Sequence, residues 1–506
     1  MPQVSRLARA LSSPAILIVA VWCAALTAVA IGPIDYPMQP TPTVLALVAA
    51  GIALFVAAHY AGAWSFDAWF QRRRANLPAP PASTLNNVVV AASLSGLAGI
   101  GLMAFDRLVL SGVSGSYMEL LRCAPALIDF IAVKRTPVLY VGYLAFSFGF
   151  ASVVLFLLKG EEIKGWGAIL AQLSILSPVG YAMLYSGRMP ILFVIVLVAA
   201  AMLVRVRQGR SPLPGGHRLF LKTAVVLVLF VAYSSAMWSS RKNFCVQMTG
   251  LISELQQRMD ARDLKQAHQP SPPPDAISAS DVSKMVAASE VKKEAPVAVE
   301  TGEWMATMRE SWHVSPRAYV IAAVDSGKLS PETAIGLLNT YFYLTHGIRV
   351  MDTTWREREQ FSPHWGVYEV GILSPIVRVF LPQDRRLANM ETQLKSTGIY
   401  GFFPTVWSAA FIDFGISGAI IYILIWGFAA GWSASGATHS RLATPSMLLT
   451  FILASIFMSL VQGPLGIANS ALVLLSMIVT GLAVDFPNLK AGSAHAAREL
   501  EVETPS

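Results

Sequence analysis

Two arginines stand at the ends of apolar runs, where a membrane would fix their height. Arg188 lies in "MLYSGRMPILFVIVL", in a short connection between two such runs, and Arg241 lies in "WSSRKNF", directly after another. A guanidinium is planar, stays protonated at working pH and presents a fork of N–H donors that matches phosphate oxygens. Two of these groups at a membrane boundary suit a ligand with a phosphate head and an apolar tail, such as a polyprenyl pyrophosphate.

Further arginines occur in the polar segment between residues 239 and 414. They are Arg317, Arg349, Arg356, Arg358 and Arg378. An arginine at a helix end often only snorkels to lipid headgroups, so none of these residues establishes a ligand site by itself. Arg356 and Arg358 in "WRERE" have the pattern of a solvated helix face, and Arg317 could simply begin a helix.

The elements that must hold these residues are membrane helices. The chain has 506 residues, of which 54% are hydrophobic and only 13% are charged, whereas soluble globular proteins carry about 25% charged residues. This composition predicts an all-α polytopic membrane protein. The net charge of +8 is attributed to membrane orientation, because no basic run is interleaved with aromatic residues as a nucleic-acid-binding surface requires.

The apolar runs predict about ten transmembrane helices, each close to the roughly 20 residues that cross a bilayer. They cover residues 13–32, 43–63, 87–105, 137–158, 166–185, 189–205, 219–238, 415–435, 446–462 and 467–484. The first run follows Arg6 and Arg9 as a signal peptide would, but no clear small-residue cleavage site follows, so we interpret it as a retained helix. These spans hold almost no ionisable residues, so we expect the functional site to lie in the connections between them.

The distribution of basic residues predicts that both termini are cytoplasmic. In that orientation the basic residues of the inner connections are Arg72, Arg73, Arg74, Lys159, Lys164, Arg205, Arg207, Arg210, Arg218, Lys222 and Arg441. The short outer connections at 33–42 and 463–466 contain none, and Arg188 faces outward. The outer connection 106–136 is an exception, because it contains several basic residues, Arg107 among them. Its stretch "SYMELLRCAPALIDFIAV" has the pattern of an amphipathic helix at the membrane surface.

The segment 239–414 is predicted to be a large extracytoplasmic loop between helices 7 and 8. Residues 262–301 are rich in Pro, Ser, Ala and charge and lack aromatics, which predicts a disordered tether. Residues 303–400 contain amphipathic stretches that we expect to fold as helices on the membrane domain. The other predicted units are helices 1–7 in residues 1–238, helices 8–10 in residues 415–484 and a cytoplasmic tail at 485–506.

The three cysteines bear on the side of the membrane that each connection faces. Cys23 lies in the first predicted span, whereas Cys123 and Cys245 lie in predicted outer connections. The outer two could form a disulfide in an oxidising compartment, or both could stay free, and the sequence leaves these alternatives open.

The C-terminal half of the chain carries a series of spaced motifs. "YFYLTHGIRVMDTTW" is followed by "YEVGILSPIVRVF" and then by "TGIYGFFPTVWSAAFIDFGISGAIIYILIWGFAAGWSAS". The spaced residues of the last passage are Tyr400, Phe402, Asp413, Phe414, Gly415, Gly418, Gly427 and Gly431. Together with the short "SGRMPI" turn, these motifs cover residues 180–435 and resemble the Wzy-type polymerases, which assemble bacterial O-antigen and exopolysaccharide from oligosaccharide repeat units. The proline-rich insert at 262–301 departs from that family's loop.

The resemblance implies a membrane glycosyltransferase with a GT-C-like helical fold in the bacterial inner membrane. Its substrates would be oligosaccharide repeat units carried on undecaprenyl pyrophosphate, joined at the periplasmic face. The terminal hydroxyl of one unit would attack the anomeric carbon of the glycan on a second carrier, and undecaprenyl pyrophosphate would leave. A chain-length regulator protein is a further expected partner. No metal or other cofactor is expected, because no Cys/His cluster has zinc spacing.

The resemblance also distributes roles among the candidate residues. Cleavage of a glycosyl–pyrophosphate bond builds negative charge on the leaving group, and fixed cations that bind this charge most strongly in the transition state accelerate the step. Arg188 and Arg241 are assigned this catalytic role. Arg349 and Arg378 are assigned to substrate binding.

The leaving group is good, so the reaction needs no strong general base. If one acts, the candidates are Glu369 in "GVYEVG" and His364 in "SPHWG". Glu369 could instead pair with an arginine, and His364 could be an ordinary surface histidine. Asp413 could bind substrate or only cap the following helix. The aromatic residues that could stack on sugar faces, or form an interfacial belt, are Tyr341, Tyr343, Trp365 and Tyr400.

Two alternative functions stay open at this stage. An O-antigen ligase would share the fold and the donor but would transfer the glycan to a lipid core, and the passage around Asp413 is more similar to the polymerases. A lipid-linked-sugar transporter or a non-catalytic scaffold belongs to another class. A transporter needs a polar path through the membrane helices, and the predicted spans are too apolar for one.

Overall fold

The structure of the protein is a computed structural model. The residues it describes are 6–37, 40–72, 81–111, 120, 123, 131–132, 136–185, 189–215, 228, 232, 244–245, 248, 250–258, 277–278, 285, 308–309, 313–361, 363, 365–370, 404–440, 442–466 and 469–502. The predicted tether at 262–301 and the predicted seventh helix at 219–238 lie almost entirely outside these residues.

Within the described residues, eight helical segments are long and apolar enough to cross a membrane. They are α2 (Pro14–Ile31), α3 (Pro42–Arg72), α4 (Ala82–Phe105) with the π-helix η1 (Asp106–Leu110), α6 (Pro137–Lys159), α7 (Trp166–Leu173) with α8 (Leu176–Leu184), α9 (Met189–Arg207), α18 (Val406–His439) and α20 (Ser470–Val502). The other described helices are α1 (Arg6–Leu11), α14 (Ala318–Asp325), α15 (Pro331–Arg356), η3 (Arg358–Gln360) and α19 (Ala443–Met458). The prediction of an all-α polytopic membrane protein is confirmed.

α18 begins before the predicted start of the eighth helix at residue 415, and it is kinked at that residue. α18 begins at Val406, where the Thr405 side chain accepts a hydrogen bond from the Ser408 backbone N–H. Asp413 therefore lies inside the helix and does not cap it. A hydropathy-based prediction begins the helix after Asp413, because a carboxylate is not expected inside an apolar helix. The burial of this carboxylate depends on hydrogen-bond partners elsewhere in the chain.

Close contacts at glycines hold α3 against α18. A Cβ at Gly62 would collide with the Phe428 carbonyl, and a Cβ at Gly431 would collide with the His59 carbonyl. Small residues that let two backbones approach closely are typical of helix packing in membranes. This contact holds α18, the helix that carries Asp413, in place against the N-terminal helices.

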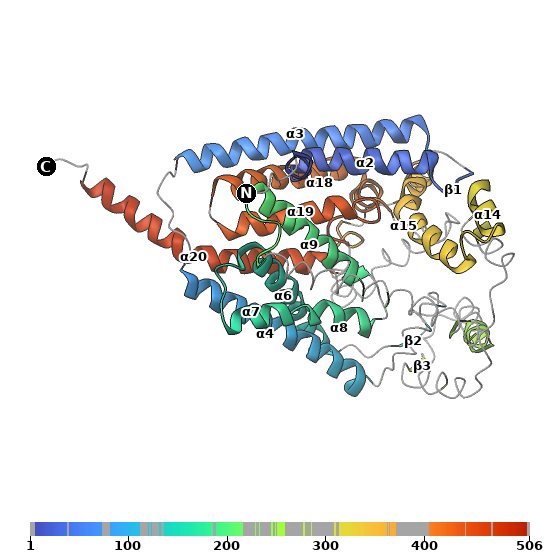
Figure 1. Cartoon of the computed structure of the whole chain (residues 1–506), viewed down its shortest axis with the longest axis horizontal. Helices are drawn as coiled ribbons and strands as arrows, with labels where there is room; N and C mark the ends of the chain where they lie inside the picture. Colours follow the sequence, from blue (N-terminus) through green and yellow to red (C-terminus); the bar gives the residue numbers. More distant parts are fainter. Residues whose placement is uncertain are drawn as a thin grey trace, which may run out of the picture.

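Several connections meet at one end of the helices, on the right in Figure 1, where α14 and α15 also lie. β1 (Ile34–Asp35) pairs antiparallel with β4 (Ser315–Pro316), and β2 (Ile131–Ala132) pairs in parallel with β3 (Ile277–Ser278). The connections after α2 and after η1 therefore both contact the long segment that precedes α18. The sequence predicted all three to be on the outer side, and they share one end of the molecule.

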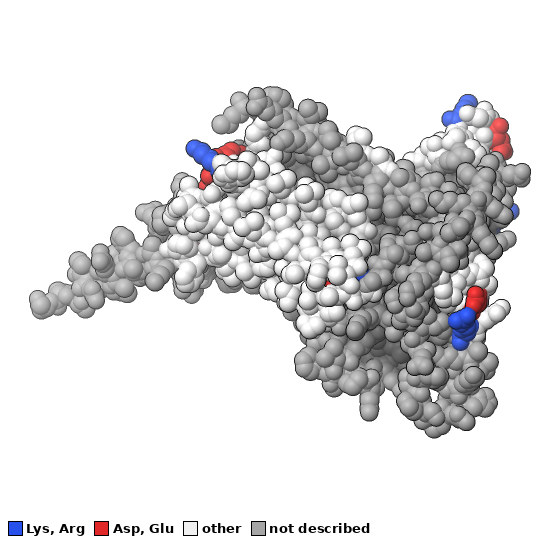
Figure 2. Space-filling view, turned by 90° about the horizontal axis from the view of Figure 1, so that it is seen from below, with Lys and Arg blue, Asp and Glu red and all other residues white. Residues whose placement is uncertain are grey.

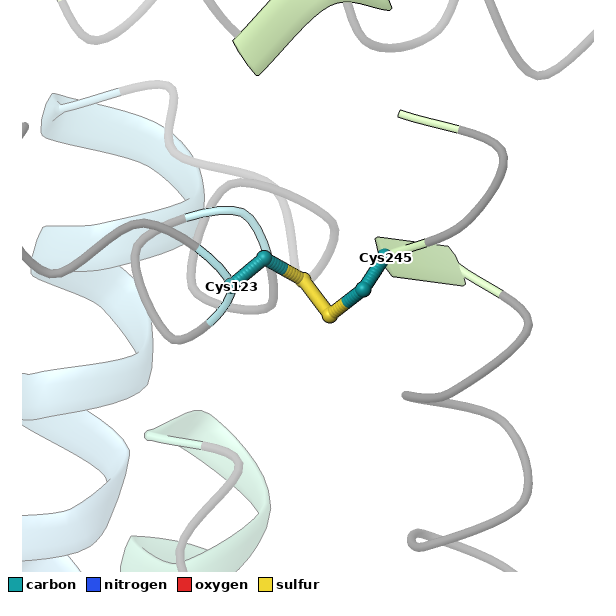
Figure 3. The surroundings of a disulfide bond; sticks show 2 residues. All are labelled: Cys123 and Cys245. Carbon is teal, nitrogen blue, oxygen red and sulfur yellow. A yellow bond between two sulfur atoms is a disulfide. The ribbon is translucent and has the colours of Figure 1, made fainter. Parts of the chain in front are cut away.

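A disulfide bond joins two of these connections. Cys123 and Cys245 are bonded (Figure 3), with their Cα atoms 5.5 Å apart. The alternative of two free cysteines is therefore excluded, and Cys23 in α2 is free and exposed. Disulfides persist in oxidising compartments, and this bond lies at the end predicted to be extracytoplasmic.

The opposite end carries basic residues that the sequence predicted on the cytoplasmic side. Arg205 is fully buried, and its Nη1 donates to the Glu161 carboxylate at 3.1 Å and to the Leu157 carbonyl at 3.0 Å. Lys159 lies 3.9 Å from the Glu162 carboxylate. On the face in Figure 2, the middle of the described part is almost entirely white, and the blue and red side chains gather toward its two ends. That distribution is expected of a protein whose middle is covered by lipid.

Candidate active site

At the end of the helices where α14 and α15 lie, a polar arrangement is built around the Asp413 side chain. This carboxylate is fully buried, and it accepts backbone hydrogen bonds from the loop 365–370. Oδ1 accepts from Gly366 N at 2.9 Å and from Tyr368 N at 3.4 Å, and Oδ2 accepts from Glu369 N at 2.9 Å. The Trp365 N–H donates to the Asp413 carbonyl at 2.8 Å. One carboxylate thus fixes the whole loop, and its charge is compensated by N–H dipoles.

Left-handed backbone conformations make this arrangement possible. Gly415, two residues after Asp413, has φ of 65° and kinks α18. In the loop, Trp365 and Gly366 have φ of 54° and 92°. A positive φ is costly for a residue with a Cβ, so the conformation of Trp365 depends on the hydrogen bonds that surround it.

Glu369 is the side chain that the Asp413 loop positions. It is 1% exposed, and its Oε1 accepts hydrogen bonds from the Tyr422 hydroxyl at 2.6 Å and from Leu465 N at 3.0 Å. Its Oε2 has no hydrogen-bond partner among the described residues. Gly463 lies directly against the carboxylate, so that a Cβ at this position would collide with both oxygens.

Burial controls the ionisation of Glu369. Loss of solvation raises the pKa of this carboxyl to about 7, although the hydrogen bonds from Tyr422 and Leu465 lower the pKa. The negative charge of Asp413 adds to the increase. A carboxyl that exchanges its proton near neutral pH can act as a general base or acid. No described arginine forms an ion pair with it, so the alternative of an arginine partner is not supported among the described residues.

The aromatic ring of Tyr422 is itself held in place. It stacks on Phe414, with ring centroids 5.5 Å apart and planes inclined by 25°. Both residues belong to α18, on either side of the kink at Gly415. The helix therefore supplies the carboxylate that orders the loop and also the hydroxyl that orients Glu369.

α15 carries the other described candidates and is anchored to the N-terminal helices. Asp352 is buried, and its Oδ1 accepts from the Thr41 hydroxyl at 2.7 Å, while Oδ2 pairs with Arg356 Nε at 3.3 Å. The Arg349 side chain is half-buried, with Nη1 3.5 Å from the His313 carbonyl. Burial lowers the pKa of the Arg349 guanidinium. The substrate-binding role predicted for Arg349 stays a prediction.

The predicted aromatic residues divide into two groups. Tyr341 donates its hydroxyl hydrogen to the Ala28 carbonyl and so fastens α15 to α2. Tyr343 is 37% exposed and Trp365 is 68% exposed, so their rings have surface available for stacking. Tyr341 thus has an anchoring role. The sugar-stacking role of Tyr343 and Trp365 stays a prediction.

Five candidate residues lie outside the described residues. They are Arg188, Arg241, His364, Arg378 and Tyr400. Among the described candidates, the structure brings Glu369 and Asp413 together, at a loop–helix junction. It adds Tyr422, Gly463 and the Leu465 N–H, which the sequence analysis missed because nothing in a linear pattern relates residue 369 to residues 422 and 465.

Two further observations bear on the type of site. Within the described residues, no group of three or more His, Cys, Asp and Glu side chains is placed to hold a metal ion. A comparison with protein-family models, with curated proteins and with solved structures finds no match for this chain. The chemistry of the site therefore has to be inferred from its own geometry.

Proposed function

We propose that this protein is a glycosyltransferase of the bacterial inner membrane that polymerises undecaprenyl-pyrophosphate-linked oligosaccharide repeat units at the periplasmic face. The observation that carries the proposal is the buried Glu369 carboxyl, with a pKa of about 7 and one oxygen without a described partner. A transfer to a sugar hydroxyl releases one proton, and this oxygen is suited to accept it.

The proposed step exchanges one glycosidic bond for another. The acceptor hydroxyl oxygen bonds to the anomeric carbon of the donor glycan, and its proton passes to Glu369. The bond from that carbon to the pyrophosphate oxygen breaks, and undecaprenyl pyrophosphate leaves with the electron pair. Negative charge thus grows on the pyrophosphate while the positive charge of the acceptor oxygen is removed.

Arginines at the outer boundary would bind the leaving group. Arg188 and Arg241 are proposed for this role on sequence grounds, and Arg349 and Arg378 for substrate binding. Removal of one cation that binds the transition state would cost on the order of a hundredfold in rate. The basic residues at the opposite end of the helices support a cytoplasmic position for the N- and C-termini.

The test is a comparison of two variants in cells that depend on this protein for their surface glycan. Glu369→Gln keeps the size of the side chain but removes the proton acceptor, and we expect glycan extension to fall by about a hundredfold or more. Glu359→Gln is the matched control, because this side chain is 90% exposed and pairs only loosely with Arg358, at 3.9 Å.

The products distinguish the alternatives. On a gel of surface glycan, loss of a polymerase leaves a single repeat unit attached to the lipid core. Loss of a ligase leaves polymer stranded on the carrier, and loss of a transporter removes both products. Normal chain lengths in Glu369→Gln would contradict the proposal that this carboxyl takes part in the reaction.

A further inference from the structure

A cluster of one arginine and three tyrosines lies at the outer ends of α4, α6 and α8. Arg107, on the π-helix η1, donates from Nε and Nη2 to the Tyr185 hydroxyl at 3.3 and 3.2 Å, and its guanidinium carbon is 5.0 Å from the centre of that ring. Tyr143 donates to the same hydroxyl at 2.6 Å. Tyr181 packs against Tyr185, with ring centroids 4.8 Å apart. π-helical turns inside α-helices often occur at functional sites.

The charge of Arg107 is not balanced within the described residues. The buried Arg205, by contrast, pairs with the Glu161 carboxylate. The described partners of Arg107 are the neutral hydroxyls of Tyr185 and Tyr143. The carboxylate of the adjacent Asp106 instead accepts a hydrogen bond from Thr136. A partly desolvated cation with neutral neighbours is expected to bind an anion.

An apolar surface adjoins this cation. Phe105, Leu108, Val109 and Leu110 are 48%, 60%, 63% and 43% exposed. They lie at the end of α4 and in η1, on an apolar segment that would face lipid. Met183, on α8, is 63% exposed. A ligand that satisfies both the cation and this surface has an anionic head and a long apolar tail.

One connection links the cluster to Glu369. The segment between α19 and α20 donates Leu465 N–H to the Glu369 carboxylate, and four residues later Asn469 Nδ2 donates to the Tyr181 hydroxyl at 2.9 Å. Asn469 has φ of 63°, a left-handed conformation that asparagine adopts more readily than most residues. The cluster and the proposed proton acceptor thus lie on either side of the same short connection.

We infer that Arg107, with Tyr143, Tyr181 and Tyr185, binds the diphosphate head of a lipid-linked substrate whose tail lies along η1 and α8. The identity of that lipid as a glycan carrier rests on the proposed function. The guanidinium of Arg107 supplies the charged donors, and the Tyr185 hydroxyl holds it in place. In the sequence, Arg188 follows Tyr185 by three residues.

The test measures lipid binding without measuring activity. The full-length protein is placed in nanodiscs of zwitterionic phosphatidylcholine, and binding of undecaprenyl pyrophosphate is titrated, with phosphatidylglycerol and inorganic pyrophosphate as competitors. We expect Arg107→Gln to weaken undecaprenyl pyrophosphate binding by tenfold or more. The matched control is Arg317→Gln, a half-buried arginine at the same end whose Nη2 donates to the neutral Ala30 carbonyl.

The competitors separate the two sources of an anionic lipid head. If phosphatidylglycerol displaces the probe as well as unlabelled undecaprenyl pyrophosphate does, the cluster only anchors bulk lipid and the inference fails. It also fails if Arg107→Gln binds the probe as the unmodified protein does. Tyr143→Phe is a milder second variant that keeps the ring, and a severalfold weaker affinity is expected from it.

The inference and the proposed function can fail separately. Binding that depends on Arg107 in a protein that extends no glycan would support the lipid site and contradict the polymerase. Normal binding by Arg107→Gln in a protein that does extend glycan would contradict the lipid site alone.

Discussion

The Asp413 carboxylate accepts the backbone N–H of Glu369 at 2.9 Å, so one buried acid fixes the position of another. The first has both oxygens occupied by loop N–H groups, whereas the second keeps one oxygen without a described partner. Two carboxyls in one small region therefore have different tasks. In the proposed reaction, Asp413 fixes the loop and Glu369 exchanges a proton.

Asp413→Asn tests this division. The asparagine side chain has one oxygen that can accept a hydrogen bond from the loop, and its NH₂ group would face backbone N–H donors. We therefore expect a loss of about 1–3 kcal/mol in the free energy of unfolding. Glycan extension should fall with it, because Glu369 loses its position. Thermal unfolding and chain length are the measurements, with the exposed Asp325→Asn as the control. Unchanged stability would contradict the structural role of this carboxylate.

The pKa of about 7 at Glu369 predicts a pH dependence. A general base acts in its deprotonated form, so the rate should rise as the pH rises through about 7 and level off above it. The Glu369→Gln variant should retain a low rate without this rise. Rates of lipid-linked glycan extension between pH 5.5 and 8.5 in reconstituted vesicles provide the test. A rate that decreases over this range would assign Glu369 the opposite role, that of an acid.

Tyr422→Phe should move that midpoint. The Tyr422 hydroxyl donates to Oε1 of Glu369 and lowers the pKa of the carboxyl, in opposition to burial. Its removal should shift the midpoint of the pH–rate profile to higher pH. Phe414, which stacks on Tyr422, is retained, so the ring has the same support. A shift to lower pH, or none, would contradict the hydrogen bond as a determinant of the pKa.

Gly463→Ala should damage activity through one contact. The new methyl group would collide with the Glu369 carboxylate, which must then move away from Tyr422 and Leu465. We expect tenfold or greater loss of glycan extension in protein that still reaches the membrane. Gly336→Ala is the matched control, because a Cβ at that position meets nothing within 4 Å. Equal activity of the two variants would contradict the prediction that the close contact between Gly463 and Glu369 matters for activity.

The disulfide predicts the number of reactive thiols. The chain has three cysteines, and two of them form the Cys123–Cys245 bond. Denatured protein purified from membranes without reductant should therefore take up one alkyl group, at Cys23, and reduced protein should take up three. Mass spectrometry counts these groups. Three modified cysteines without reductant would place these connections in a reducing compartment and contradict the proposed orientation.

The membrane helices were largely predictable, and their irregularities were not. Hydropathy gave the ends of α2, α6 and α9 within two residues and those of α4 within five, because each is a continuous apolar run. The first turns of α18 were missed because they end in Asp413, whose charge is satisfied by N–H groups about 45 residues earlier in the chain. No local pattern contains that information.

The candidate site shows the same limit. Glu369 and Asp413 were selected from residue type and family resemblance, but their roles depend on hydrogen bonds between distant segments. Arg107 was noted only as an exception to the distribution of basic residues. Its contact with Tyr185 joins positions 78 residues apart, and this contact accounts for a cation at the end of an apolar helix.

The length of α19 has a consequence for the chemistry beside it. This helix has 16 residues and is therefore about 24 Å long, less than the roughly 30 Å of a hydrocarbon core. If the Ala443 end of α19 lies at one surface of a bilayer of that thickness, the other end stops short of the opposite surface, and the segment that carries Gly463 and Leu465 starts in a recess. In the proposed reaction, little free water would be present in such a recess to compete with the acceptor hydroxyl, so the activated glycan would be protected from hydrolysis.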